Sequence, residues 1–247
     1  MPEMNAPDLL ALVYFTGAWI AYSIAVEKTA HGRSSLNALM HQYRDQWMQQ
    51  MLARDMRMVD GQVTASLQNG TAFFASTSLI AIGGALTLLR SSEEMITLVA
   101  VLPFGVSPTR AQWEAKMLGL AIIFAYAFFK FAWSYRLYNY VAIMIGAAPP
   151  PAQKNTRAGQ ELAHRTARVC EDAGRHFNRG QRAFFFALGY LGWFLGPLPL
   201  IATTTGVVVV MYRRQFSSES RKAFSPGGGK DSGKTRKRPK RGPSARP

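Results

Sequence analysis

One lysine lies deep inside an uncharged, aromatic-rich stretch of the chain. A charge such as that of Lys130 is costly to place in a membrane interior, and such charges often mark a functional site. Tyr126, Trp133 and Tyr140 recur every seven residues and form one helical stripe, with Lys130 and Arg136 about 60° to either side of it. Cations beside aromatic faces could hold an anion or a lipid phosphate.

The same residues also fit an anchor at the membrane boundary. If a helix enters the membrane at Met117, Lys130 lies about 20 Å in and Arg136 about 29 Å in. At that depth long side chains reach water and aromatic residues form a belt. Glu27, at the end of an earlier apolar block, is a candidate counter-ion for either cation. We favour anchoring and keep a ligand site as the alternative.

Other residue patterns point to no defined reaction. Glu161 and His164 have the Glu-x-x-His spacing of di-iron bundles, but the sequence holds no second copy. The four histidines are scattered, at positions 31, 41, 164 and 176, and Cys170 is the only cysteine. We find no phosphate-binding glycine loop and no nucleophile elbow. A non-enzymatic protein is therefore favoured, with an enzyme left open, and neither a metal nor a cofactor is expected.

Four apolar blocks must position these residues. The chain of 247 residues is 48% hydrophobic and carries a net charge of +15, with the basic residues between and after the blocks. Blocks of about 18 uncharged residues are long enough to cross about 30 Å of hydrocarbon. The sequence thus predicts an all-α, polytopic membrane protein with a helical domain at residues 1–215. Its hydrophobic segments are expected at about 9–26, 72–89, 117–136 and 183–211.

Amphipathic cytoplasmic helices are predicted between these segments. The stretch 33–69 has apolar residues at three-and-four spacing, interrupted at Asp60-Gly61, and we favour packing on the protein over insertion among headgroups. The stretch 155–182 has an inner face of small residues that suits close helix packing: Ala163, Ala167, Cys170, Ala173 and Gly174. The third block is expected to continue as a helix until Pro149. Residues 216–247 are predicted to be a disordered basic tail.

The fourth block decides the orientation of the chain. Residues 27–71 hold five Lys and Arg, residues 134–182 hold eight and residues 212–247 hold twelve, against three in 90–116. With four full crossings these segments divide almost evenly between the two sides, so the positive-inside rule does not decide. Gly196-Pro197-Leu198-Pro199 interrupts the fourth block, which either kinks there or folds back as a re-entrant hairpin. A hairpin would place both large loops and the tail in the cytoplasm.

Three groups of motifs carry a family resemblance. They are Phe73–Ser78, then Phe124–Trp133 with Tyr135–Tyr140, and finally His176–Gly180 with Trp193–Pro197. In this order and spacing they resemble an uncharacterised family of bacterial and plant membrane proteins, catalogued as domain of unknown function 599 (DUF599), over about residues 9–215. The resemblance implies a multi-helix membrane protein without an assigned activity.

Two of these motifs fall at the predicted cytoplasmic ends of membrane segments. Their polar residues are candidates for a cluster that binds lipid or another anion, or equally for helix caps and headgroup contacts. The candidate residues are Lys130, Arg136, Asn139, His176, Asn178 and Arg179.

The predicted function is packing or scaffolding, without enzymatic activity, in the bacterial inner (plasma) membrane, with contacts to anionic lipid. The competing prediction is a small anion or solute transporter or channel in which Lys130 and Arg136 line the path. A membrane enzyme comes third. The expected partners are the lipid bilayer and anionic lipids, with a homo-oligomer left open. No specific nucleic acid is expected, because one aromatic residue in the tail beyond Phe216 gives little support for base stacking.

Overall fold

The structure is a computed structural model and describes residues 5–28, 36–101 and 108–216. Every regular element in these ranges is helical, which confirms the predicted all-α class. The elements in chain order are α1 (Ala6–Lys28), α3 (Leu36–Leu52), α4 (Met58–Arg90), α5 (Ser92–Ala100), α6 (Arg110–Gly146), the 3₁₀ turn η1 (Pro151–Gln153), α7 (Arg157–Tyr190), the 3₁₀ turn η2 (Leu191–Leu195) and α8 (Pro197–Phe216). Apart from Phe216, the predicted tail lies outside the described residues.

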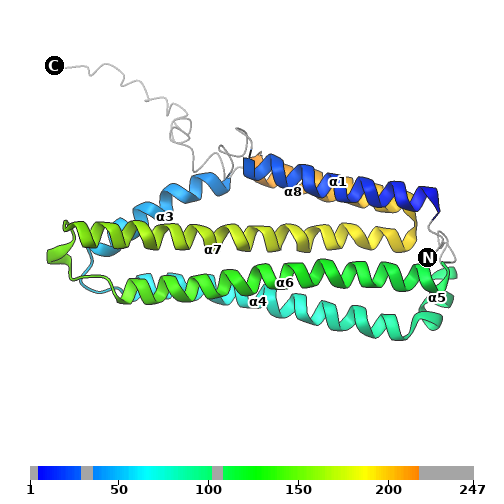
Figure 1. The fold of residues 1–247 in the computed structure, drawn as a ribbon, viewed down its shortest axis with the longest axis horizontal. Helices are drawn as coiled ribbons and strands as arrows, with labels where there is room; N and C mark the ends of the chain where they lie inside the picture. Colours follow the sequence, from blue (N-terminus) through cyan, green and yellow to red (C-terminus); the bar gives the residue numbers. More distant parts are fainter. Residues whose placement is uncertain (1–4, 29–35, 102–107, 217–247) are drawn as a thin grey trace, which may run out of the picture.

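Three long helices, α4, α6 and α7, run side by side along the molecule, and α6 packs on both of the others (Figure 1). α1 and α8 lie together over one half of this layer, whereas α3 packs on α7 in the other half (Figure 1). α5, the start of α1 and the turn between α7 and α8 share one end of the molecule. α1 and α8 both end part-way along α7, and we call this level the boundary.

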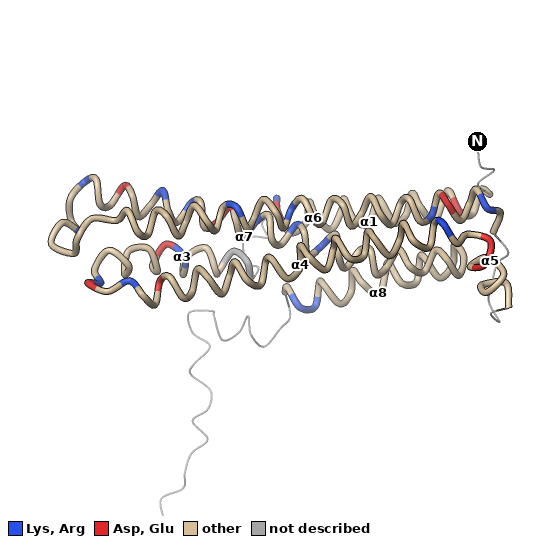
Figure 2. Tube along the Cα trace, turned by 90° about the horizontal axis from the view of Figure 1, so that it is seen from below, with Lys and Arg blue, Asp and Glu red and all other residues tan. Residues whose placement is uncertain are grey.

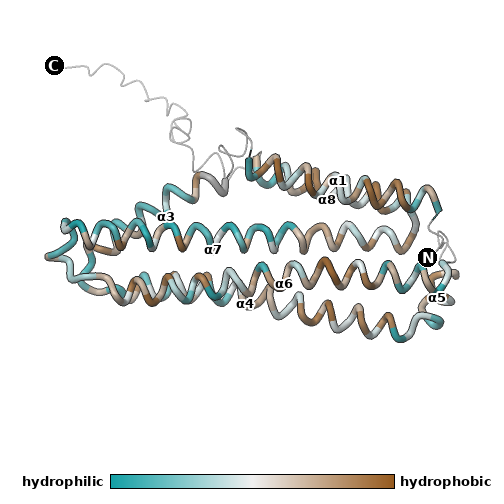
Figure 3. The backbone as a smooth tube through the Cα atoms, viewed as in Figure 1, coloured by the Kyte–Doolittle hydropathy of each residue, from teal (hydrophilic) through white to brown (hydrophobic). Residues whose placement is uncertain are grey.

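Hydropathy divides the molecule at the boundary. Hydrophobic residues concentrate in the half that contains α1 and α8, and hydrophilic residues in α3 and the first part of α7 (Figure 3). We call these the apolar half and the polar half. Three helices, α1, α4 and α6, are long and apolar enough to cross a membrane. Because α6 has 37 residues and measures about 55 Å, it continues well beyond a hydrocarbon layer of about 30 Å.

The bounds of α6 follow from its ends. Thr109 caps the first turn by accepting a hydrogen bond from the Gln112 backbone N–H, and the Gln112 side chain accepts one from the Thr109 backbone N–H. The helix therefore begins seven residues before the predicted Met117. It ends at Gly146, as the prolines from Pro149 on predict.

Residues 36–69 fall in two helices, α3 and the first part of α4, so the prediction of one helical segment over 33–69, interrupted at Asp60-Gly61, is corrected. The chain turns between α3 and α4. Arg57 holds this turn against the segment that follows α6, because its guanidinium donates hydrogen bonds to the backbone carbonyls of Ala148 (2.7 Å) and Pro149. Asp60 instead lies in the first turn of α4, fully buried, and accepts a hydrogen bond from Trp47 Nε1 at 2.7 Å. A carboxylate is favourable there because it faces the positive end of the helix dipole.

The fourth apolar block is two antiparallel helices. α7 runs without a break through residues 157–190, so the predicted helix at 155–182 and the start of the block are one element. The chain then reverses through η2 at Gly196, whose φ of 126° suits a residue without a side chain. α8 returns alongside α1 to the boundary (Figure 1). Both ends of the hairpin thus lie on the same side of the apolar half, and its turn lies at the far end.

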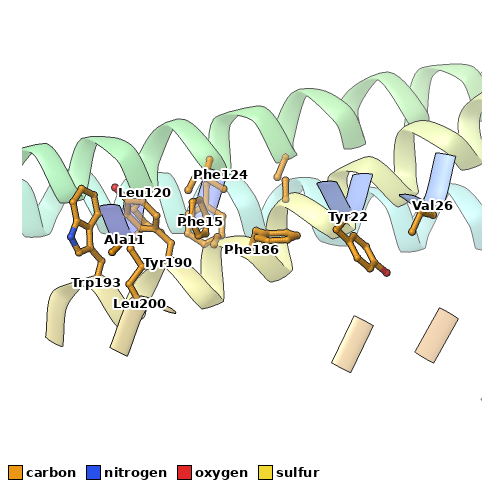
Figure 4. Close-up of a cluster of buried hydrophobic side chains, with 14 of the residues drawn as sticks. Ala11, Phe15, Tyr22, Val26, Leu120, Phe124, Phe186, Tyr190, Trp193 and Leu200 are labelled. Atoms are coloured by element: carbon orange, nitrogen blue, oxygen red, sulfur yellow. The ribbon is translucent and has the colours of Figure 1, made fainter. Parts of the chain in front are cut away.

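Two hydrophobic cores hold these helices together. In the apolar half, Phe15 meets Phe186 and Tyr190 edge to face (Figure 4). Trp19 stacks on Phe186 with ring centroids 5.3 Å apart. In the polar half, α3 buries Met48 and Met51 against α6 and α7, which supports packing on the protein itself. The small face of α7 is confirmed as the contact surface, with these residues all buried: Ala163, Ala167, Cys170, Ala173 and Gly174.

Candidate functional site

Cationic side chains gather at the boundary from α6, α7 and α8. Figure 2 shows Lys and Arg at this level, including the end of α8, and few charges between it and the opposite end of the apolar half. The helices place them there because each apolar stretch finishes at the same level. The last turn of α8 contains Arg213 and Arg214, and that of α1 contains Lys28.

The strongest polar contact at the boundary joins α1 to α7. The Glu27 carboxylate accepts two hydrogen bonds from Arg179, from Nε at 3.0 Å and from Nη2 at 2.6 Å, and a third from Arg182. Such a two-pronged geometry fixes the orientation of both groups. The side chain of Arg182 is only 8% exposed, so this ion pair also neutralises a buried charge. Glu27 therefore pairs with cations of α7 rather than with Lys130 or Arg136.

Lys130 and Arg136 rest on aromatic rings of their own helix. Lys130 Nζ lies 5.1 Å from the ring centroid of Tyr126, and the Arg136 guanidinium lies 5.6 Å from those of both Trp133 and Tyr140. Arg136 Nε also donates to the Tyr140 hydroxyl at 2.6 Å. The three rings are all exposed on the surface of α6. Cations and aromatic rings therefore face the same surroundings on this part of α6.

The other predicted residues fall in different places. Asn139 Oδ1 accepts a hydrogen bond from Gln68 Nε2 of α4 at 2.6 Å, so it joins two helices. The His176 ring meets the Trp133 ring edge to face. Asn178 lines a pocket between α1, α7 and α8. The Trp133 ring thus lies between Arg136 and His176, Arg179 pairs with Glu27, and Asn139 and Asn178 lie in other surroundings.

Two functional candidates escaped the sequence reasoning. Arg182 follows Arg179 by three residues and therefore shares its helix face, a spacing that could have revealed it. At the far end of the apolar half, Lys116 Nζ donates to the Trp193 carbonyl at 2.9 Å and lies 3.9 Å from Asp8 Oδ1. Trp193 Nε1 donates to the same Asp8 oxygen at 2.6 Å. Lys116 directly precedes the predicted apolar segment 117–136. The sequence reasoning therefore did not treat it as a charge inside the membrane.

Two histidines in the described ranges, His41 and His164, lie beside carboxylates. His41 Nδ1 lies 3.4 Å from Glu171 Oε1, and His164 Nδ1 lies 3.3 Å from Asp45 Oδ1, both across the contact between α3 and α7. Glu161 of the Glu-x-x-His pattern pairs with Arg165. Within the described residues no three His, Cys, Asp or Glu side chains are placed to hold a metal ion. His31 lies outside the described residues.

The fold and the boundary define a helical protein of the membrane type, with an apolar helical half and a polar helical extension. The chain matches a family described as protein of unknown function, DUF599, over residues 10–220, and it belongs to that family. The resemblance seen in the motifs is therefore confirmed. No curated protein and no protein of solved structure matches the chain.

Proposed function

We propose that this chain is a non-enzymatic protein of the bacterial inner membrane that packs or scaffolds there and contacts anionic lipid at the boundary. One observation carries the lipid contact. Lys130 and Arg136 lie on exposed aromatic rings, and among the described residues no carboxylate lies within ion-pair distance of either. Two uncompensated cations beside aromatic rings suit lipid phosphates at a membrane surface.

The hairpin formed by α7 and α8 supports a lipid contact on the cytoplasmic side of the membrane. It returns the chain to the boundary, where residues 27–71 and 134–182 and the basic segment after α8 all begin or end. Residues 27–71, 134–182 and 212–247 together hold 25 of the 29 Lys and Arg residues, so the positive-inside rule favours a cytoplasmic boundary. Anionic lipids are concentrated in the cytoplasmic leaflet, and the negative charge of its surface attracts such cations.

The packing role rests on the surface of α4. Only 11% of its most apolar stretch is buried within the chain, which leaves a long face for lipid or a neighbouring helix. Gly83 and Gly84 lie on this face, and a Cβ added to either would meet no atom within 4 Å. Small residues of this kind let helices approach closely in a membrane.

Native mass spectrometry of the full chain in a neutral detergent tests the lipid contact. The probe is phosphatidylglycerol, compared with phosphatidylcholine, on the wild type and on Lys130→Met/Arg136→Gln. The matched control is Lys154→Met/Arg157→Gln, which removes the same two charges at the exposed tip of the polar half. We expect phosphatidylglycerol adducts to fall in the first variant and to persist in the control.

Equal retention of phosphatidylglycerol by both variants would overturn the proposed contact. An anion flux in proteoliposomes that depends on Lys130, without preferential lipid binding, would favour the transporter instead. A reporter fused after Pro247 tests the orientation, and activity of a periplasm-dependent reporter would contradict a cytoplasmic boundary.

A further inference from the structure

We propose that the pocket between α1, α7 and α8 binds the phosphate group of a phosphate-bearing ligand. This site goes beyond the lipid contact of α6 and shares no residue with Lys130 or Arg136. The pocket has a volume of about 230 Å³ and opens at the boundary. The polar residues that line it are Tyr22, Asn178, Gln181, Arg182, Arg214 and Gln215.

The charge around this pocket is positive. Arg182 reaches it from α7 and Arg214 from the last turn of α8, so guanidinium groups stand on two different walls. Glu27, the nearby carboxylate, is engaged by both Arg179 and Arg182. Arg179, Arg182 and Arg214 together with Glu27 give a net charge of +2 around the pocket, which favours an anionic ligand.

One donor in the pocket has no partner among the described residues. Gln215 Nε2 is buried and makes no hydrogen bond within the described part of the chain. A buried N–H group without a partner costs free energy, and where the protein does not satisfy it, ordered water or a bound ligand can. Arg214 and Gln215 both line the pocket, so a single ligand there can reach both side chains.

The donors select a phosphate by their chemistry. A guanidinium presents paired N–H groups in one plane that match phosphate oxygens, and amide N–H groups add further donors. A phosphate has oxygens pointing in several directions and can accept from α7 and α8 at once. Phosphates at this depth have two sources, a lipid headgroup at the membrane surface or a soluble phosphate ester from the adjoining water.

Full-length protein in neutral detergent allows the two sources to be separated. One arm titrates short-chain phosphatidylglycerol, and the other titrates glycerol 3-phosphate, with binding followed by isothermal calorimetry. The variants are Arg214→Gln and Gln215→Leu. The matched control is Arg213→Gln, which removes the same charge from the neighbouring exposed residue that does not line the pocket. Circular dichroism and the melting temperature establish that each variant folds.

We expect saturable binding of one phosphate-bearing ligand per chain. Arg214→Gln should weaken it by about tenfold, the loss of one charge-assisted hydrogen bond, and Gln215→Leu should weaken it in the same direction. Arg213→Gln should leave it unchanged. Saturation by phosphatidylglycerol alone would assign the site to a headgroup, and saturation by glycerol 3-phosphate would assign it to a soluble ester.

Two results would overturn the inference. One is the absence of saturable binding in both arms, and the other is an equal loss in Arg213→Gln and Arg214→Gln, which would show unspecific attraction. The Lys130→Met/Arg136→Gln variant keeps this test separate from the proposed function. If that variant retains lipid while Arg214→Gln loses it, the contact of α6 fails and the phosphate pocket stands.

Discussion

The ring of Phe131 in α6 packs so closely on Gly180 in α7 that a Cβ atom at Gly180 would lie 2.7 Å from Phe131 Cε1. Phe131 is fully buried and stacks on Phe74 of α4 with ring centroids 5.3 Å apart. It also meets Phe177 edge to face. One ring therefore joins the three long helices, and it does so where the motif His176–Gly180 supplies a residue without a side chain.

Gly180→Ala should lower the free energy of unfolding by about 1–3 kcal/mol, because the added methyl group forces the Phe131 ring or the α6–α7 contact to move. The melting temperature in detergent, followed by circular dichroism, measures this effect. Gly206→Ala in α8 is the control, since a Cβ there meets no atom within 4 Å and alanine favours a helix. Equal melting temperatures for the two variants would contradict the role of Gly180.

The far end of the apolar half offers a second prediction. Asp8→Ala should lower the free energy of unfolding by about 2 kcal/mol, because Lys116 then keeps its buried charge without the Asp8 carboxylate. The double variant Asp8→Ala/Lys116→Met should recover part of the loss, since no unpaired ammonium remains. Chemical unfolding of the four proteins of this cycle gives the coupling. A double variant that loses the sum of both single effects would argue against an interacting pair.

The helices themselves could be predicted from the sequence to a large extent. Apolar blocks long enough to cross a membrane became α1, α4 and α6, and Pro149 marked the end of α6 because proline cannot continue a helix. The turn at Gly196 was located, but a kink and a hairpin use the same residues. Only the packing of α8 on α1 distinguishes them, and that contact is between residues far apart in sequence.

The partners of the candidate residues were harder to predict. Glu27 and Arg179 are 152 positions apart, so their pairing depends on where α1 lies against α7. Hydropathy gives the depth of a residue along its helix but not the neighbour that it faces. The sequence pattern therefore predicted Lys130 and Arg136 at a boundary with aromatic rings, but it named these cations of α6 as partners of Glu27, whereas Arg179 and Arg182 of α7 pair with it.

Cys170 provides a probe of the polar half. Burial raises the pKa of its thiol from 9.0 to about 11, and the side chain is fully buried against α3 and α6. Two pKa units correspond to about 100-fold less thiolate at neutral pH, so the folded protein should react very slowly with iodoacetamide. Mass spectrometry of the alkylated chain, with and without denaturant, measures the difference.

Gly174→Ala should slow this reaction further. A Cβ at Gly174 would lie 2.7 Å from Nη2 of Arg44, whose positive charge lowers the pKa of the Cys170 thiol, so displacing this guanidinium leaves less thiolate. Gly61→Ala in α4 is the control, because its added Cβ meets no atom within 4 Å. Alkylation of the wild type at the rate of the unfolded chain would show that α3 does not protect the thiol.

The contact between α3 and α7 should weaken on mild acidification through His41. Burial lowers the pKa of His41 below 6.5, Glu171 raises it, and the positive charges of Arg44 and Arg175 lower it further. The folded protein therefore prefers the neutral imidazole. This part of the stability is present above pH 6.5 and is lost as the pH falls through the lowered pKa of the folded state.

The variant His41→Gln should remove this pH dependence. The effect on stability should be about 0.5 kcal/mol or less, because solvent screens a side chain that is one-third exposed. Melting temperatures of both proteins between pH 7.5 and 5.5 measure the effect, and an unchanged pH slope in the variant would show that another group is responsible.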